Sequence, residues 1–270
     1  MKNYPGVEVM LSLSLCIFSF GFVPQIRAQS QAAEPARRTV VVELFTSEGC
    51  STCPAADALL QKLQEQQLVA GADVIALEEH VDYWNHLGWS DPYSSPEWTQ
   101  RQLAYSEFFK TQAYTPQMVV DGEKQFVGSN EGDAAREIEN AARRGETDVA
   151  IGSGTAGAKG ERQFTVTVGA LGENAKRDVA EVWLAVTEDG LQSSVSRGEN
   201  SGHMLHHAAT LRSLHKIGVA DPNKAAASFT GDPHVKFDSH WNQDNLRVVV
   251  FVQEKKGREI LGAASLKVTH

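Results

Sequence analysis

The chain has 270 residues, of which 41% are hydrophobic, which is typical of one large or two modest globular domains. Its formal net charge of −9 disfavours binding to nucleic acid or to an anionic membrane surface, because both are themselves negatively charged. We therefore expect a globular protein with a sizeable core and no nucleic-acid partner.

The first 28 residues have the pattern of a secretory signal peptide. Lys2 precedes a short apolar stretch, Met10–Val23, and a plausible cleavage position follows Ala28. A membrane anchor is the alternative, but the apolar stretch is short for a bilayer. Cleavage would remove two positive charges and one negative charge, moving the net charge from −9 to −10. We expect a periplasmic or secreted protein without a membrane span after cleavage, with residues 29–38 as a mobile leader.

The most informative stretch joins an apolar run, Val40–Phe45, to a Cys-x-x-Cys motif at Cys50 and Cys53. A helical pattern starts at Pro54, so the motif stands where a buried strand gives way to a helix. The helix N-terminus favours a thiolate on Cys50, and Cys53 lies one turn further along, where it can resolve a mixed disulfide. The pattern therefore indicates thiol–disulfide exchange. Signal cleavage would leave only these two cysteines.

Three other interpretations of the Cys-x-x-Cys motif stay open. Half a zinc site would need two more ligands, and no cysteine follows Cys53 to supply them. An inert disulfide is possible in an exported protein. A soft Cu(I) site would use Cys50, Cys53 and a histidine such as His80.

A carboxylate interrupts the buried strand just ahead of the motif. Glu43 could hold or transfer the proton of the resolving thiol, which would make it part of the catalytic set. The alternative is that Glu43 points to the edge of the sheet or pairs with a cation. Glu48 precedes Cys50 by two residues, and its charge would raise the pKa of that thiol.

A second apolar run, Ala72–Leu77, predicts a strand parallel to the first. The segment Glu78–Tyr93 follows it and holds four aromatic residues, two histidines and several carboxylates. This segment starts at the sheet edge that also bears the cysteines, where open α/β sheets bind ligands. It therefore predicts one wall of a substrate groove. The candidate groove residues are Glu48, His80, Asp82, Trp84 and Trp89.

Histidines raise the question of a metal site at two places. His80, Asp82 and His86 form one set, and the segment Gly202–His207 holds another. Aromatic packing and turn capping are the alternative for the first set. A strand is the alternative for the second, in which adjacent histidines point to opposite faces. We assign no metal ligand and no cofactor.

The remaining pattern up to residue 145 predicts a helix from Pro96, a strand after Pro116, a tight hairpin at Asp121-Gly122 and a helix from Ser129 or Asn130. The order β-α-β-α-β-β-α, with Cys-x-x-Cys after the first strand and Thr115-Pro116 before the third, resembles the thioredoxin fold. The stretches Glu43–Pro54, His80–Trp84 and Leu87–Trp89 also resemble a family of secreted, thioredoxin-like bacterial proteins known as domain of unknown function 1223.

The resemblance to thioredoxin-like enzymes implies roles for individual residues. Cys50 would be the nucleophile, Cys53 would resolve, and a cis Pro116 with Thr115 would bind the partner. Ser47-Glu48-Gly49 departs from the aromatic-containing segment of that pattern. Family 1223 has no established activity, so the resemblance implies a fold and not a reaction.

After residue 145 the pattern changes to short strands separated by turns. Strand signals recur at 163–168, 179–187, 191–196, 246–253 and 259–268. The sequence therefore predicts an α/β plus all-β protein: a thioredoxin-like domain over 39–145, followed by an antiparallel β-sandwich-like domain over 146–270. The expected function is an exported thiol–disulfide oxidoreductase whose substrate is a protein or small thiol or disulfide. The alternative is a periplasmic copper-binding or partner-binding protein.

Overall fold

The structure, a computed structural model, describes residues 1–3, 6, 37–157, 160–172, 175, 178–224 and 226–269. Its contacts divide the chain into two units, Met1–Glu34 and Pro35–His270, and the fold below is that of the second unit. The expected signal peptide and leader fall almost entirely outside the described residues. Within the described residues, no helix has the length and apolar character needed to cross a membrane.

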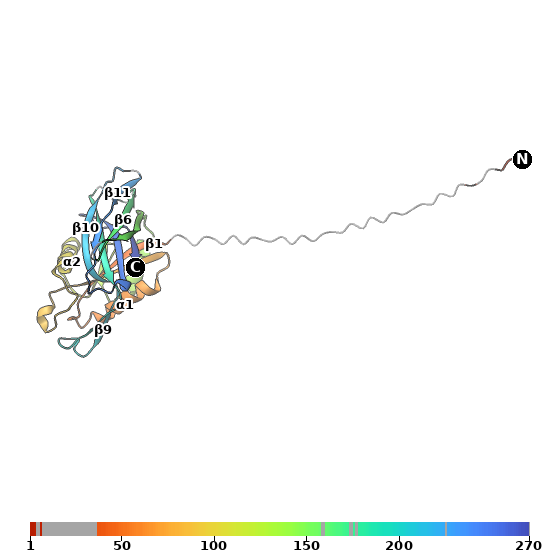
Figure 1. The fold of residues 1–270 in the computed structure, drawn as a ribbon. Helices are drawn as coiled ribbons and strands as arrows, with labels where there is room; N and C mark the ends of the chain where they lie inside the picture. Colours follow the sequence, from red (N-terminus) through yellow and green to blue (C-terminus); the bar gives the residue numbers. More distant parts are fainter. Residues whose placement is uncertain are drawn as a thin grey trace. The chain divides into compact units, whose positions relative to one another are not determined.

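The described body is mostly β-structure (Figure 1). Its α-helices are α1 (Pro54–Gln66), α2 (Pro96–Phe109) and α3 (Glu131–Ala142). The strands of the main sheet are β1 (Arg38–Thr46), β2 (Ala72–His80), β3 (Gln117–Val120), β4 (Lys124–Val127), β7 (Ala180–Glu188), β10 (Thr210–Ala220), β13 (Leu246–Glu254) and β14 (Ile260–Lys267). The other strands are β5 (Val149–Ala156), β6 (Glu161–Gly169), β8 (Leu191–Ser194), β9 (Met204–His207), β11 (Ala227–Gly231) and β12 (His234–Lys236). Short 3-10 turns are η1 (Asn85–Leu87) and η3 (Gln243–Asn245).

The main sheet has eight strands in the order β14-β13-β7-β10-β2-β1-β3-β4. Strands β1 and β2 are parallel, as expected for the β-α-β unit around the Cys-x-x-Cys motif. Strand β3 pairs antiparallel with β1, and β4 returns through the predicted Asp121-Gly122 turn. Strands β5, β6, β11 and β12 form a second sheet, and β8 pairs with β9.

This sheet shows that the predicted fold class is wrong. The body is not a thioredoxin-like α/β domain followed by a separate β-sandwich, because strands from both halves of the chain are neighbours in one mixed sheet. The junction is β2 with β10, where Thr210 is paired with Glu78 and the Glu78 N–H donates to the Ala209 carbonyl at 2.9 Å. Hydrophobic patterns located several of the strands but not β10, which lies more than a hundred residues after β2 and completes its free edge.

The two faces of the main sheet near β1 have different coverings. Side chains of Val40, Val42 and Leu44 form one buried core with α1 and α3. The alternate residue Val41 faces the other way and packs with Trp98 of α2. That second core also contains Ala185, Leu211, Val249 and Phe251, so both halves of the chain share it. A further core joins the second sheet to β7 and β13.

Local signals set the ends of the helices. The hydroxyl oxygen of Ser95 accepts the Glu97 N–H at the start of α2, and Asn130 caps α3 by accepting the Asp133 N–H. Helix α1 has no side-chain cap and begins at Pro54, with the Cys53 carbonyl accepting the first helical hydrogen bonds. The three helices expected from the sequence are therefore confirmed.

Candidate functional site

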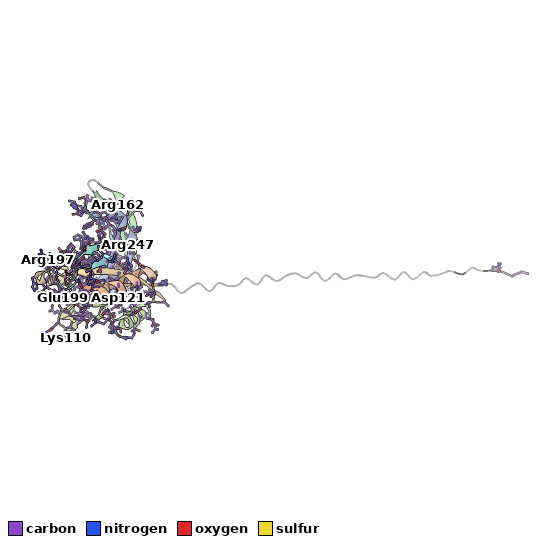
Figure 2. The ribbon with its side chains drawn as sticks, turned by 90° about the horizontal axis from the view of Figure 1, so that it is seen from below. Lys110, Asp121, Arg162, Arg197, Glu199 and Arg247 are labelled. Atoms are coloured by element: carbon purple, nitrogen blue, oxygen red, sulfur yellow. A yellow bond between two sulfur atoms is a disulfide. The ribbon has the colours of Figure 1, made fainter. Side chains whose placement is uncertain are left out.

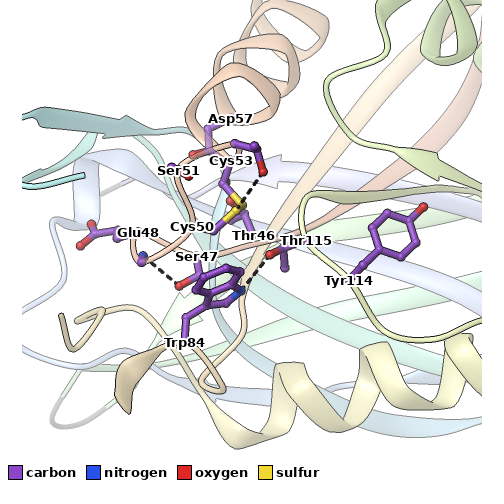
Figure 3. Close-up of a disulfide and its surroundings, with 12 residues drawn as sticks. Thr46, Ser47, Glu48, Cys50, Ser51, Cys53, Asp57, Trp84, Tyr114 and Thr115 are labelled. Carbon is purple, nitrogen blue, oxygen red and sulfur yellow. Dashed lines mark hydrogen bonds between the residues drawn. A yellow bond between two sulfur atoms is a disulfide. The ribbon is translucent and has the colours of Figure 1, made fainter. Parts of the chain in front are cut away.

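The two cysteines form a disulfide at the amino end of α1 (Figure 3). The loop that holds them is a pair of tight turns, in which the Cys50 N–H donates to Ser47 and the Cys53 N–H donates to Cys50. Ser51 is exposed, whereas Cys50 is 1% exposed and Cys53 is fully buried. The disulfide thus lies just beneath a surface loop and out of direct contact with solvent.

The segment around Thr115 and Pro116 lies beside this loop (Figure 3). The Thr115–Pro116 peptide bond is cis and leads into β3, the neighbour of β1. The indole N–H of Trp84 donates to the Thr115 hydroxyl at 2.9 Å. A Cβ at Gly49 would lie only 3.0 Å from the Cβ of Trp84, so a side chain at this position would have to push Trp84 away.

A segment from the second half of the chain covers the cysteine loop from the other side. Residues 195–203 join β8 to β9, and the buried Asn200 amide donates to the carbonyls of Glu48 (2.8 Å) and Cys50 (3.0 Å). The Ser51 N–H donates to the carboxylate of Glu199 (labelled in Figure 2) at 3.1 Å. The sequence pattern gave no sign of this cover, since no local signal ties residue 200 to residue 50.

Two histidines and three carboxylates form a buried cluster next to the cysteine loop. Nδ1 of His80 lies 2.7 Å from Asp91 Oδ2, and Nδ1 of His207 lies 3.2 Å from Glu78 Oε1. Nε2 of His207 donates to Glu48 Oε1 at 3.0 Å. These five side chains are at most 3% exposed. The cluster joins β2, β9 and the loops after β1 and β2.

The charges of this cluster shift one another's pKa values. Burial alone would lower the pKa of His80, but Asp91 raises it well above its ordinary value. Burial likewise opposes the charged form of His207, and Glu78 raises its pKa to about 9. Burial would raise the pKa of Glu78, but His207 and His80 lower it to about 2. In the absence of a metal, the cluster therefore favours charged imidazoles between ionised carboxylates.

Asp57 lies between this cluster and the cysteines. It stands one helical turn after Cys53 on α1, and its backbone N–H donates to the Cys53 carbonyl. Its buried carboxylate accepts a hydrogen bond from the Thr46 hydroxyl at 2.6 Å. Burial first, and then the charge of Glu78, raise the pKa of Asp57 to about 7. The sequence analysis missed Asp57, although an acid four residues after the second cysteine is a readable signal.

Glu43 lies on the other face of the sheet from α1. Its carboxylate accepts from Arg101 Nε at 2.5 Å and from the Tyr105 hydroxyl at 2.6 Å, both on α2. Glu79 is 3.5 Å from the same Arg101 nitrogen, and burial followed by the charge of Glu43 raises the pKa of Glu79 well above its ordinary value. The structure thus pairs Glu43 with a cation, which is the alternative weighed for it above, and does not bring it to the cysteines.

The remaining predicted groove residues are buried or half-buried, whereas two of the histidines considered as metal ligands are exposed. Trp89 donates from its indole N–H to Glu48 at 2.7 Å, so both join the buried histidine cluster. Asp82 accepts from the Thr99 hydroxyl at 2.6 Å and ties its loop to α2. His86 is exposed on η1. On β9, His206 is exposed and His207 is buried, as expected for adjacent residues of a strand.

Comparison with protein families gives one match, described as "Protein of unknown function (DUF1223)", over residues 41–253. The chain belongs to this family. The matched range includes the cysteine loop and also residues 195–203, which pack over that loop. Both features therefore belong to the family region. No functionally curated protein matches the chain. Membership therefore brings no assigned reaction, and no assigned substrate, to this DUF1223 protein.

Two solved structures share the fold. A protein from Agrobacterium tumefaciens is 24% identical, with a TM-score of 0.62, and the alignment covers 88% of this chain and 97% of that one. HBP35 of Porphyromonas gingivalis is 16% identical, also with a TM-score of 0.62, over 87% of this chain and 76% of that one. At these identities the likeness concerns the fold alone.

Proposed function

We propose that this DUF1223 protein is an exported thiol–disulfide oxidoreductase that works through Cys50 and Cys53. The observation that carries the proposal is the disulfide at the amino end of α1, with Asp57 one turn behind it and Thr115–Pro116 beside it. A helix amino end stabilises a thiolate, and a disulfide suits an oxidising compartment. The signal-like first 28 residues agree with export.

The exchange step begins with a thiolate of the partner. It attacks the Cys50 sulfur, a new S–S bond forms, and the Cys50–Cys53 bond breaks with Cys53 leaving as a thiolate. A second partner thiolate then attacks the mixed disulfide and releases Cys50. The partner's two thiols become one disulfide, and the Cys50–Cys53 pair gains two electrons. The reverse sequence oxidises the pair and reduces a partner disulfide.

Asp57 is the group that we assign to the proton of Cys53. Its carboxyl group has a pKa of about 7, so it holds a proton for part of the time at neutral pH. Because residues four apart on a helix are neighbours, this proton can neutralise the Cys53 thiolate as it forms. We therefore assign the transfer of the Cys53 proton to Asp57 and not to Glu43. The copper alternative has no support among the described residues, because His80 groups with Glu78 and His207 and not with the cysteines.

The proposal is tested by the reduction potential of the Cys50–Cys53 pair and by trapping. A potential between about −120 and −270 mV supports exchange, and a value below about −300 mV marks a structural disulfide and contradicts it. The Cys53→Ser variant should accumulate a mixed disulfide when its Cys50 thiolate attacks a model disulfide, because one sulfur of that disulfide leaves as a thiolate and no Cys53 thiol remains to release the other. The variant lacking both cysteines is its control and should trap nothing.

A further inference from the structure

Three side chains of the buried cluster point their nitrogen and oxygen atoms toward one another. Glu78 and His80 are two residues apart on β2, so both lie on the same face of that strand, and His207 ends β9. Their candidate ligand atoms all lie within 4.8 Å of one another, and all three side chains are buried. Two imidazoles and one carboxylate are a ligand set that occurs in zinc enzymes.

Two separations within this set, each to a different oxygen of Glu78, are close to those around a tetrahedral metal ion. Glu78 Oε1 is 3.2 Å from His207 Nδ1, and Glu78 Oε2 is 3.5 Å from His80 Nε2. Two ligands that each lie 2.0–2.1 Å from a tetrahedral zinc ion are about 3.3 Å apart. The carboxylate therefore stands at a ligand's distance from both imidazoles.

One nitrogen of the set has only a long ion pair as its contact among the described residues. His80 is fully buried, and its Nδ1 is bonded to Asp91, whereas its Nε2 makes no hydrogen bond and lies 3.5 Å from Glu78 Oε2. A buried nitrogen without a hydrogen bond is costly, and a cation bound between it and the carboxylate is one way to satisfy both. Nε2 faces Glu78, the carboxylate that His207 shares.

The outer contacts of the set also have the form found around metal-bound histidines. Such a histidine usually donates from its other ring nitrogen to a carboxylate, which fixes the tautomer that presents a lone pair to the metal. Asp91 holds His80 in this way at Nδ1, and Glu48 holds His207 at Nε2, 3.0 Å away. Thr210 donates its hydroxyl to Glu78 at 3.0 Å. All three inner side chains are thus oriented by an outer one.

We propose that Glu78, His80 and His207 form a binding site for one zinc ion. Zinc commonly binds a mixed set of imidazole nitrogens and carboxylate oxygens. Imidazole ligands argue against magnesium and calcium, and the absence of sulfur from the set argues against Cu(I). The set does not include Cys50 or Cys53, so the site stands independently of the exchange function. The ring of Tyr93 packs edge-on against both imidazoles, with ring centroids 5.5 Å apart in each pair, and shields the site from solvent.

The first test uses the unaltered chain, free of any affinity tag that contains histidine and with its disulfide intact. We expect one zinc ion per chain after incubation with ZnCl₂ and removal of loose metal by a weak chelator. X-ray absorption of the zinc should give only nitrogen and oxygen neighbours at about 2.0–2.1 Å. A sulfur neighbour at about 2.3 Å would assign the metal to the cysteines and overturn the proposal. Failure to retain zinc would also overturn it.

The second test compares two neighbouring histidines on β9. His207→Gln should lower zinc affinity at least tenfold, whereas His206→Gln, which changes an exposed side chain, should leave the affinity unchanged. Equal losses in both variants would contradict the site. If His207→Gln fails to fold, as judged by circular dichroism, Asp91→Asn replaces it. That outer-contact variant should lower zinc affinity about 10–100-fold, and an unchanged affinity would contradict the site.

Discussion

The side-chain amide of Asn200 donates a hydrogen bond of 3.0 Å to the backbone carbonyl of Cys50, across 150 positions of sequence. The same nitrogen donates to the Glu48 carbonyl at 2.8 Å, so one side chain holds both ends of the turn that leads into the disulfide. Because Asn200 belongs to the segment between β8 and β9, the second half of the chain holds the backbone of the cysteine loop in place.

Asn200→Ala should open this cover. It leaves two buried carbonyls without their donor, which costs about 1–3 kcal/mol in the free energy of unfolding. We expect the Cys50–Cys53 disulfide to be reduced faster by dithiothreitol in the folded variant than in the unaltered protein. The rate is measured by alkylation of the released thiols. Asn140→Ala on the exposed face of α3 is the matched control. If both variants react at the unaltered rate, Asn200 does not limit access.

Asp57→Asn should change how stability depends on pH. The pKa of Asp57 is raised from 3.8 to about 7, so the folded protein keeps this proton more tightly than the unfolded chain does. This contribution to stability is complete below about pH 4 and is lost as pH rises through about 7. The variant should therefore gain on the unaltered protein between pH 4 and 8, by about 4 kcal/mol at most.

Urea unfolding of the two proteins at several pH values measures this difference. The comparison measures Asp57 together with the groups coupled to it, because its charge acts on Glu78, His207 and His80. A difference in unfolding free energy that stays constant from pH 4 to 8 would show that Asp57 has an ordinary pKa and would remove the proton role assigned to it.

Arg101→Ala should be among the more damaging single changes on α2. Arg101 is the cation between the fully buried carboxylates Glu43 and Glu79, and its loss leaves them without a counter-charge. Breaking a buried ion pair in this way costs about 3–5 kcal/mol. Arg136→Ala removes an exposed ion pair on α3, which solvent screens, and should cost far less than the loss of Arg101. Chemical unfolding at neutral pH checks both values, and equal costs would contradict a structural role for Arg101.

Glu43→Gln should leave the reduction potential of the cysteines unchanged while altering stability, because Glu43 lies on the α2 face of the sheet. A matched measurement on Asp57→Asn should show a shifted potential, since that side chain is on the cysteine face. If Glu43→Gln shifts the reduction potential and Asp57→Asn does not, Glu43 and not Asp57 acts on the cysteines.

Gly122→Ala should be much more destabilising than Gly71→Ala, although both glycines have positive φ angles, +69° and +76°. The left-handed conformation costs each alanine about 1–2 kcal/mol. A Cβ at Gly71 meets nothing, whereas one at Gly122 would overlap the carbonyl oxygen of Arg258. Gly122→Ala must therefore also push apart the β3–β4 turn and the chain before β14. Thermal unfolding compares the two, and equal losses would contradict this contact.

The sequence by itself determined the local elements and the place of the cysteine loop between a strand and a helix. The Cys-x-x-Cys stretch between a buried strand and a helix, the hairpin at Asp121-Gly122 and the caps at Ser95 and Asn130 follow from interactions among residues a few positions apart. Strands β6, β7, β8, β13 and β14 of the second half follow from the same short-range pattern, whereas β5, β10, β11 and β12 were not predicted. The family resemblance rested on such local motifs too, and the match over residues 41–253 confirms membership of the DUF1223 family.

Only the tertiary structure decided which strands became neighbours and which side chains met. The pairing of Thr210 with Glu78 places β10 beside β2 and turns two expected domains into one sheet. The same pairing brings His207 to Glu78 and Asn200 to Cys50. Contacts of this kind depend on the free energy gained when whole faces of the sheet are buried. The residues that contribute to this free energy are more than a hundred positions apart, so a short stretch of sequence does not reveal these contacts.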